Sequence, residues 1–175
     1  EENKYFSEMI FSQLQEKDLI EEKEIEQLFD TEKNLFLSDK YVKGTCPSCN
    51  AKEQYGDNCE SCSSAYSAID LIDPVSVLSD SKPEIRKSIH LFFKLSKLRK
   101  SIKEWLETSK VPKQAVNKLS EWTEGEIKDW DISRDGPYFG FEIPGYPNKF
   151  FYVWMDAPIG YLASHKNYLD RLGKS

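Results

Sequence analysis

Four cysteines close together constrain the fold of this chain more than any other feature. They are Cys46, Cys49, Cys59 and Cys62, they follow the pattern C-x2-C-x9-C-x2-C, and the chain has no other cysteine. Pairs spaced this way suit knuckles around a metal ion better than disulfides, which are typical of small secreted domains. Four thiolates in a tetrahedron are the ligands of structural zinc, and such a closed site leaves no position for water. The pattern predicts one structural zinc site, with two disulfides or an iron site as the alternatives.

The residues around the cysteines predict a compact double knuckle. The spacer between the two pairs is shorter than the ~15–20 residues of long zinc ribbons. Each knuckle also needs a residue near the left-handed helical conformation after its second cysteine, and Asn50 and Ser63 stand at these positions. Asparagine adopts that conformation readily and serine less so.

Composition excludes several classes of protein. The chain has 175 residues with 24 Lys+Arg and 30 Asp+Glu, a net charge of −6, and an aromatic content of 13% that excludes a disordered chain. The longest apolar run, residues 150–155, is far short of the ~20 residues that cross a bilayer. No basic segment followed by an apolar one opens the chain. These features predict a cytoplasmic globular protein without a membrane partner, and the start at Glu1 without Met predicts a piece of something larger.

One basic segment is hidden within this acidic chain. Residues 82–118 hold 11 basic and 3 acidic side chains, a net charge of +8. Such a segment can contact phosphate groups. Because no aromatic residues alternate with the charges, a solvated helix face is the preferred interpretation.

Hydrophobic spacing predicts alternating helices and strands, which indicates an α+β fold. The expected elements are a helix over 3–17, two strands around a turn at 30–34, an extended piece at 69–78, a strand at 90–95, two helices within 98–125, a hairpin of 138–143 with 150–154, and a last helix with Asp156 as its N-cap.

Few other residues suggest chemistry. His90 and His165 have no cysteine or carboxylate at ligand spacing, so both are expected to be non-catalytic. Asp129, Asp131 and Asp135 form a cluster that is expected to be a solvated loop. The sequence contains no phosphate-binding glycine loop, dinucleotide fingerprint or H-E-x-x-H motif.

Two longer stretches carry a resemblance to a known family. The first joins residues 44–49 (GTCPSC) to residues 55–62 (YGDNCESC), and the second joins residues 130–140 (WDISRDGPYFG) to residues 152–161 (YVWMDAPIGY). Together they closely resemble the methionyl-tRNA synthetases, in the bacterial form with one four-cysteine zinc site. That family is a class I aminoacyl-tRNA synthetase, a methionine–tRNA ligase that activates methionine with ATP and Mg²⁺ and transfers it to tRNA(Met).

The resemblance also implies a domain organisation. Residues 1–17 would be a helix of the first catalytic half, residues 18–131 a connective peptide with zinc knuckles at 44–64, and residues 132–175 the return into a Rossmann-like catalytic domain. Only the flanks of that catalytic domain would be present. With the rest missing, Phe6, Ile10, residues 150–154 and Tyr161 are expected to be exposed.

The resemblance further implies site residues. Trp154, Ala157, Pro158 and Tyr161 would line the pocket for the methionine side chain, and Arg134 would be a possible active-site contact. The HIGH-type and KMSKS-type signatures that hold ATP are absent from these 175 residues, so the chain is expected to be inactive without the missing catalytic halves in cis.

Two alternatives stand beside this interpretation. One is a stand-alone zinc-knuckle module that binds RNA or protein through residues 82–118. The other is the connective peptide of a class I synthetase for an aliphatic amino acid, which the stretch at residues 152–161 disfavours.

Overall fold

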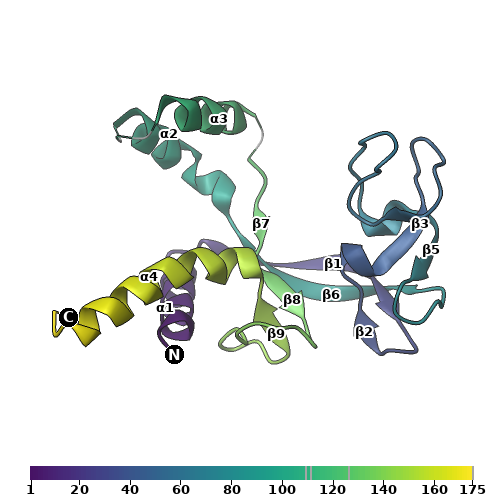
Figure 1. The fold of residues 1–175 in the computed structure, drawn as a ribbon, viewed down its shortest axis with the longest axis horizontal. Helices are drawn as coiled ribbons and strands as arrows, with labels where there is room; N and C mark the ends of the chain where they lie inside the picture. The colour runs from purple at the N-terminus through teal and green to yellow at the C-terminus, as the bar shows by residue number, and fades with distance from the viewer. Residues whose placement is uncertain (109, 111, 126, 175) are drawn as a thin grey trace. The chain divides into compact units, whose positions relative to one another are not determined.

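The helices and strands of the computed structural model confirm the α+β composition (Figure 1). The structure describes residues 1–108, 110, 112–125 and 127–174. It divides into unit 1, Glu1–Lys23 with His90–Arg134 and Gly140–Ser175, and unit 2, Glu24–Ile89 with Asp135–Phe139. The domain boundaries that the resemblance implies, after residues 17 and 131, stay predictions. The two units are defined by contacts within the chain and do not test these boundaries.

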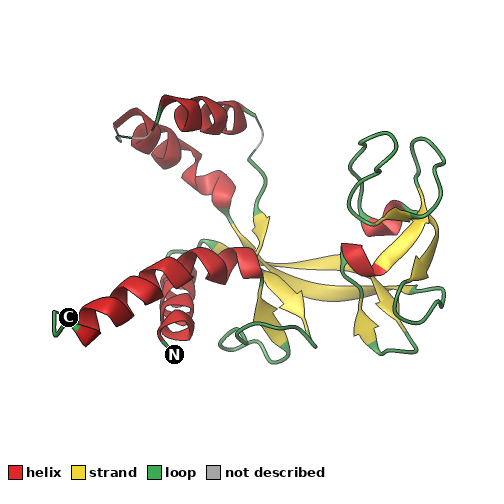
Figure 2. Cartoon of the chain, in the orientation of Figure 1, coloured by secondary structure: helices red, strands yellow, loops and turns green. Residues whose placement is uncertain are grey.

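Four helices, three short 3-10 helices and nine strands lie in the described residues (Figure 2). The helices are α1 (Glu2–Glu16), α2 (Arg99–Thr108), α3 (Lys113–Glu124) and α4 (Val153–Arg171), and the 3-10 helices are η1 (Asp39–Tyr41), η2 (Ala68–Asp70) and η3 (Leu95–Leu98). The strands are β1 (Ile20–Asp30), β2 (Leu35–Phe36), β3 (Val42–Thr45), β4 (Gln54–Tyr55), β5 (Ile72–Ser76), β6 (Glu84–Phe93), β7 (Trp130–Asp131), β8 (Ser133–Asp135) and β9 (Lys149–Phe151).

These strands form three sheets. The largest has the order β2-β1-β6-β7, the second β4-β3-β5, and the third pairs β8 with β9. Strand β1 turns into β2 with Phe29 opposite Phe36, which confirms the predicted turn. The strand expected at 90–95 is confirmed for residues 90–93, the last part of the longer β6, whereas Leu95 already begins η3. Pro74 lies within β5 rather than interrupting it.

Unit 1 is built on a core of apolar side chains from α1, α4 and the strand ends. Its buried members are Phe11, Leu91, Ile132, Ile143, Phe151, Met155 and Ile159. Helix α1 presents Phe11 to this core, where its ring meets Phe151 edge to face at 5.4 Å. The predicted helix over 3–17 is confirmed within a residue at each end, although Phe11 rather than its neighbours is its most buried apolar residue.

Unit 2 has a smaller apolar core than unit 1. The core consists of Leu28, Leu37, Val42, Ala68 and Leu71. The buried carboxylate of Asp30 accepts hydrogen bonds from the hydroxyls of Ser76 and Ser79, both at 2.6 Å. It also accepts bonds from the backbone N–H groups of Glu32 and Lys33. This carboxylate therefore ties the end of β1 to the turn after β5.

The C-terminal part of the chain corrects two predictions. The predicted hairpin of 138–143 with 150–154 is confirmed only in part: Glu142 and Phe150 form an antiparallel bridge, the N–H groups of Ile143 and Phe151 donate to the carbonyls of Lys149 and Phe141, and β9 also pairs with β8. Helix α4 begins at Val153, with Tyr152 extended before it, so Asp156 lies in the first turn and is not the N-cap. The helix starts earlier because Met155 and Ile159, four residues apart, both enter the core.

The expected exposed patch is partly present. Phe151 is buried in the core of unit 1, which corrects that part of the prediction, whereas Trp154 is 63% exposed and Tyr161 82% exposed. Phe6 and Ile10 are half-buried against the same core. Among the described helices, none combines the length and hydropathy needed to cross a membrane.

Candidate functional site

The four cysteines converge in unit 2 with the geometry of a metal centre. Their Sγ atoms all lie within 4.8 Å of one another. Cys46 and Cys62 are 3.9 Å apart and Cys49 and Cys59 3.6 Å apart, too far for disulfide bonds. Four sulfurs placed ~2.3 Å from a central ion in a tetrahedron are ~3.8 Å apart. The thiols therefore fit a four-coordinate metal ion.

The two knuckles repeat one backbone arrangement. In the first, the N–H of Cys46 donates to Ala51 and the N–H of Asn50 donates back to the carbonyl of Cys46. In the second, Cys59 and Ser63 make the corresponding bonds. Asn50 and Ser63 have φ angles of 60° and 59°, which confirms the predicted left-handed positions. Each turn thus directs its two sulfurs toward the same point. The residues that allow the turn, Asn50 and Ser63, directly follow the second cysteine of each pair.

Hydrogen bonds favour the thiolate at Cys46 and Cys62. At Cys49 a backbone N–H bond lowers the pKa, but the neighbouring thiol of Cys62 and burial outweigh it and raise the pKa to about 12. Burial raises the pKa of Cys46, but backbone N–H groups of Cys49 and Ser48 donate to its sulfur and lower the pKa to about 6. The hydroxyl of Ser64, 3.1 Å away, lowers the pKa of Cys62. Thiolates are the form that ligates metal.

A second site lies on α4 in unit 1. An open cavity of about 710 Å³ is lined by Trp130, Val153, Trp154, Ala157, Pro158, Gly160, Tyr161 and Ser164. The structure therefore brings together all four residues that the resemblance assigns to methionine, namely Trp154, Ala157, Pro158 and Tyr161. Apolar and aromatic walls of this kind select a ligand by shape rather than by charge.

Helix α4 packs one side into the core and lines the cavity with the other. Met155, Ile159 and Ala163 are buried, while the lining residues occupy the other side of the helix. Pro158 is the sixth residue of the helix and has no N–H, so the carbonyl of Trp154 receives no helical hydrogen bond from it.

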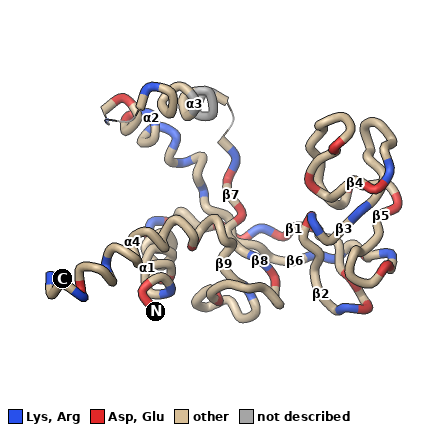
Figure 3. The backbone as a smooth tube through the Cα atoms, viewed as in Figure 1, with Lys and Arg blue, Asp and Glu red and all other residues tan. Residues whose placement is uncertain are grey.

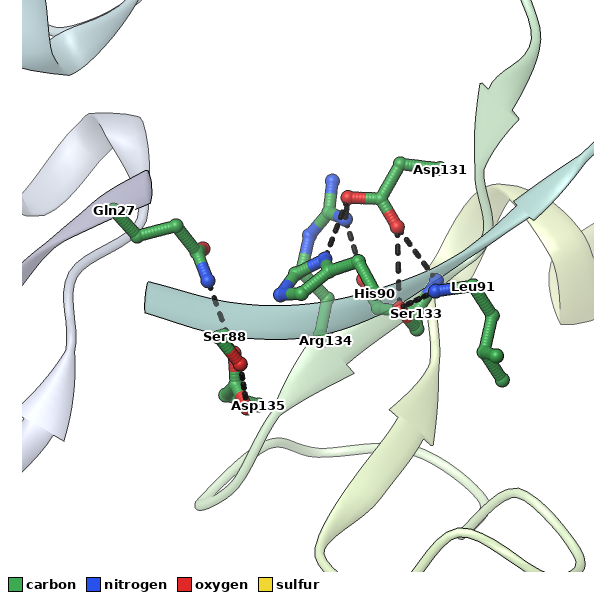
Figure 4. A network of polar contacts seen from close by, with 8 residues as sticks. All are labelled: Gln27, Ser88, His90, Leu91, Asp131, Ser133, Arg134 and Asp135. Atoms are coloured by element: carbon green, nitrogen blue, oxygen red, sulfur yellow. Dashed lines mark hydrogen bonds and ion pairs between the residues drawn. The ribbon is translucent and has the colours of Figure 1, made fainter. Parts of the chain in front are cut away.

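Arg134 belongs to a polar network in unit 1 rather than to the cavity lining (Figure 4). Its Nη1 donates to Asp131 Oδ2 at 3.0 Å and to the carbonyl of Ser133 at 2.6 Å. The guanidinium lies 3.8 Å over the ring of Tyr152. The side chain of Arg134 is 28% exposed.

Comparison with known proteins shows the family of this chain. A family model described as "tRNA synthetases class I (M)" matches residues 1–175. The chain belongs to this family. Among solved structures, Mycobacterium tuberculosis methionyl-tRNA synthetase bound by methionyl-adenylate has a TM-score of 0.56 at 15% identity, covering 93% of this chain and 28% of that one. The same enzyme in its apo form has a TM-score of 0.55 at 15% identity, covering 91% and 28%.

These structures show the fold of the synthetase chain. It is class I synthetase-like, with helices, sheets and a cluster of four cysteines suited to a zinc knuckle. The chain spans about 28% of the length of the solved synthetases that it matches.

Sequence reasoning missed several residues of this synthetase chain. Trp130 and Ser164 line the cavity, and the helical spacing from Ala157 and Tyr161 would have indicated Ser164. His90 is 1% exposed, and its Nδ1 lies 2.8 Å from Asp131 Oδ2. No sequence signal joins His90 to Asp131, because their contact depends on the pairing of β6 with β7.

The three aspartates are not a solvated loop, which corrects that prediction. Asp131 and Asp135 lie in strands β7 and β8. Asp129 accepts from Ser96 and pairs with Lys23 at 3.4 Å. Each carboxylate is therefore held by neighbouring side chains from its own unit.

The basic segment is partly neutralised by carboxylates of this chain. Lys and Arg residues gather along η3 and α2 (Figure 3). Lys94 and Lys97 both pair with Asp18, and the hydrogen bonds from Lys97 and then Lys94 lower the pKa of Asp18 to about 2. Arg99 donates to the carbonyl of Gly125.

Proposed function

We propose that this chain is part of a methionine–tRNA ligase, in which it supplies a zinc-stabilised connective peptide and one wall of the methionine pocket. The observation that carries the proposal is the cavity on α4, where Trp154, Ala157, Pro158 and Tyr161 converge. The methionine-linked family and the class I fold are consistent with this assignment.

The chemistry of the cavity suits a thioether side chain. Two indoles and a phenol surround the space, and sulfur–aromatic contacts contribute about 0.3–1.5 kcal/mol each. Methionine is unbranched, so it can enter an open cavity between flat rings. A charged side chain would lose its hydration here without gaining an ion pair.

The metal of the four-cysteine site is proposed to be one structural zinc ion. Cys46, Cys49, Cys59 and Cys62 would hold it, and no ligand position would remain for catalysis. Its role would be to stabilise unit 2, whose own core is small. Because thiols must stay reduced to bind zinc, we place the protein in the cytoplasm.

The remaining parts of the reaction belong to the full enzyme. ATP, Mg²⁺ and tRNA(Met) would bind mainly to catalytic segments outside these 175 residues, and in this proposal those segments would be part of the same polypeptide. Arg134 would contribute a guanidinium to the reactive groups of the substrate, since only one of its terminal nitrogens is used by Asp131 and Ser133.

Methionine-dependent exchange between ATP and pyrophosphate tests the proposal. We expect activity in the full-length protein and none in the isolated chain. In the full-length protein, Trp154→Ala should raise the methionine KM more than Trp154→Phe, which keeps an aromatic wall. Tyr168→Ala on the same helix, outside the cavity, is the matched control.

Three results would contradict the proposal. They are full-length protein without methionine-dependent exchange, exchange by the isolated chain, and equal methionine KM values for Trp154→Ala and Tyr168→Ala. Metal analysis should give one zinc ion per chain, and a chain with two disulfides and no zinc would remove the metal assignment.

A stand-alone module that binds RNA or protein through residues 82–118 is the competing candidate. It would leave the apolar cavity without a function, and five of the basic side chains of the segment already pair with carboxylates of this chain, namely Arg86, Lys87, Lys94, Lys97 and Lys100. The ligase is therefore preferred.

A further inference from the structure

A series of side-chain contacts connects the buried His90 to the wall of the cavity. His90 Nδ1 lies 2.8 Å from Asp131 Oδ2, which also accepts a bond from Arg134 at 3.0 Å. The guanidinium of Arg134 lies 3.8 Å over the ring of Tyr152. The ring of Tyr152 is parallel to that of Trp154, at 4° with centroids 6.3 Å apart. Trp154 in turn lines the cavity. All five residues belong to unit 1.

The carboxylate of Asp131 is fixed on both oxygens. Oδ2 receives His90 and Arg134, while Oδ1 receives the N–H of Ser133 at 3.0 Å and its hydroxyl at 3.2 Å (Figure 4). Because a carboxylate only accepts, His90 Nδ1 must carry the hydrogen. The same Ser133 hydroxyl accepts from the N–H of Leu91, the residue after His90. These hydrogen bonds therefore connect the His90–Asp131 pair to both β6 and β8.

A histidine at this position needs an explanation beyond packing. The side chain is 1% exposed, in a strand whose next residue, Leu91, is part of the apolar core. Replacing a buried polar pair by apolar groups is often neutral or stabilising, so stability alone does not require the pair. Buried hydrogen-bonded networks do, however, hold their members in one geometry.

We propose that His90 is a positioning residue for the methionine cavity: through Asp131 it holds Arg134 against Tyr152, and Tyr152 in turn orients Trp154. This inference rests on the proposed function of the cavity. His90 is not among the residues that line the cavity, and it takes no part in the chemistry.

The exposure of Trp154 explains why such support is needed. Its side chain is 63% exposed, so core packing alone does not fix the indole. The parallel ring of Tyr152 supplies a flat support on a nearby residue, and the guanidinium of Arg134 limits movement of that ring. Residues that support a binding group from behind determine how well it is preorganised.

The first experiment compares His90→Leu with wild type in the full-length protein. Leucine keeps the site apolar and buried but removes the donor to Asp131. Because Trp154 offers the methionine side chain one sulfur–aromatic contact, its misplacement should raise the methionine KM by about two- to tenfold. The ATP KM should change by less than about twofold, since the loss concerns binding of one substrate.

A conservative variant separates positioning from folding. In His90→Asn, the amide nitrogen stands near the place of Nδ1 and can donate to Asp131, so it should restore most of the methionine KM. A second pair acts further along the series: Tyr152→Phe keeps the ring and should resemble wild type, whereas Tyr152→Leu should resemble His90→Leu. If His90→Leu does not fold, the Tyr152 pair decides the question.

A measurement that needs no activity makes the inference independent of the ligase assignment. With 5-fluorotryptophan incorporated, the ¹⁹F resonance of Trp154, assigned through Trp154→Phe, should shift or broaden in His90→Leu and return in His90→Asn. The resonance of Trp105, exposed on α2, serves as the internal control.

The outcomes distinguish the two proposals. Wild-type protein without methionine-dependent exchange overturns the proposed function, while the ¹⁹F result still decides whether His90 orients Trp154. A folded His90→Leu protein with unchanged methionine KM and unchanged Trp154 resonance overturns the inference. The inference is also overturned if Tyr152→Leu matches Tyr152→Phe in both readouts.

Discussion

At the scale of single residues, buried charges in this chain are held by many hydrogen bonds at once. Asp30 has no exposed surface, yet two hydroxyls and two backbone N–H groups donate to its carboxylate. Burial by itself raises the pKa of Asp30, but the bonds from Ser76, Ser79 and the backbone outweigh it and lower the pKa to about 2. The folded structure thus favours the ionised carboxylate more strongly than the unfolded chain does.

This carboxylate predicts a dependence of stability on pH. The pKa of Asp30 falls from an ordinary 3.8 to about 2 on folding, so its contribution is complete above pH 4 and is lost as the pH falls from about 4 to 2. Asp30→Asn should reduce stability at pH 7 and flatten that part of the profile, as measured by urea unfolding at stepped pH.

Loss of metal in acid affects wild type and variant alike, so the difference between their profiles isolates Asp30. Asp57→Asn, the same change of charge at an exposed position of unit 2, should leave stability close to wild type. Parallel profiles for wild type and Asp30→Asn would refute the assignment.

At the scale of elements, α4 combines a buried face with a face that lines the cavity, and Pro158 lies on the cavity face. Pro158→Ala would restore the N–H that can donate to the carbonyl of Trp154 and should make the helix more stable, by up to ~3 kcal/mol. The same change should weaken methionine binding, because Pro158 lines the cavity and the backbone at Trp154 would move. Thermal unfolding and the methionine KM measure the two effects.

Pro144→Ala, in an exposed turn, is the control, because it alters proline content without touching the helix. It should leave the methionine KM unchanged and slightly lower stability by freeing the unfolded chain. A Pro158→Ala protein that is neither more stable nor weaker in binding would show that the proline does not shape this wall.

The double knuckle is the second element whose role can be measured. Cys46→Ala combined with Cys49→Ala removes half of the ligands and should abolish metal binding. Structural zinc contributes about 10–16 kcal/mol of apparent binding free energy, so residues 44–64 should lose protection from hydrogen exchange. Activity of the full-length protein should fall through loss of positioning.

Ser61→Ala, between the two cysteines of the second knuckle, keeps every ligand and should retain full metal content. Protection and activity at wild-type levels in the double cysteine variant would remove the stabilising role of the metal.

At this scale, the features that could be predicted from the sequence are those whose determinants lie close together in the chain. The metal site, the turns at Asn50 and Ser63, and helix α1 were predicted because their determinants lie within a few residues of one another. The start of α4 was placed too late because Asp156 resembles an N-cap, whereas core packing of Met155 determines the start. The resemblance supplied the cavity residues, but the contact of His90 with Asp131 spans 41 residues and has no local signature.

At the scale of the whole molecule, each unit has its own apolar core. Phe11 is fully buried in unit 1, so Phe11→Ala should destabilise that unit by about 3–5 kcal/mol. Metal retention in unit 2 should be unaffected at temperatures where unit 1 begins to open. Hydrogen exchange of α1 and α4, together with zinc content, measures both.

Tyr5→Ala provides the comparison on the same helix, because Tyr5 is exposed and surface substitutions usually change stability by no more than about 0.5 kcal/mol. If Phe11→Ala released the metal in parallel with the opening of α1, the two cores would have to be treated as one cooperative system.

The closeness of the two knuckles along the chain also has a consequence for folding. All four sulfurs and the hydrogen bonds that shape them lie within residues 46–64, whereas β1 and β6, neighbours in one sheet, are separated by more than fifty residues. Short loops close at lower entropic cost and on faster timescales than long ones. During synthesis, the knuckles emerge from the ribosome before β6 does. We therefore expect the metal-bound turn to form first and to act as a nucleus on which the later strands assemble.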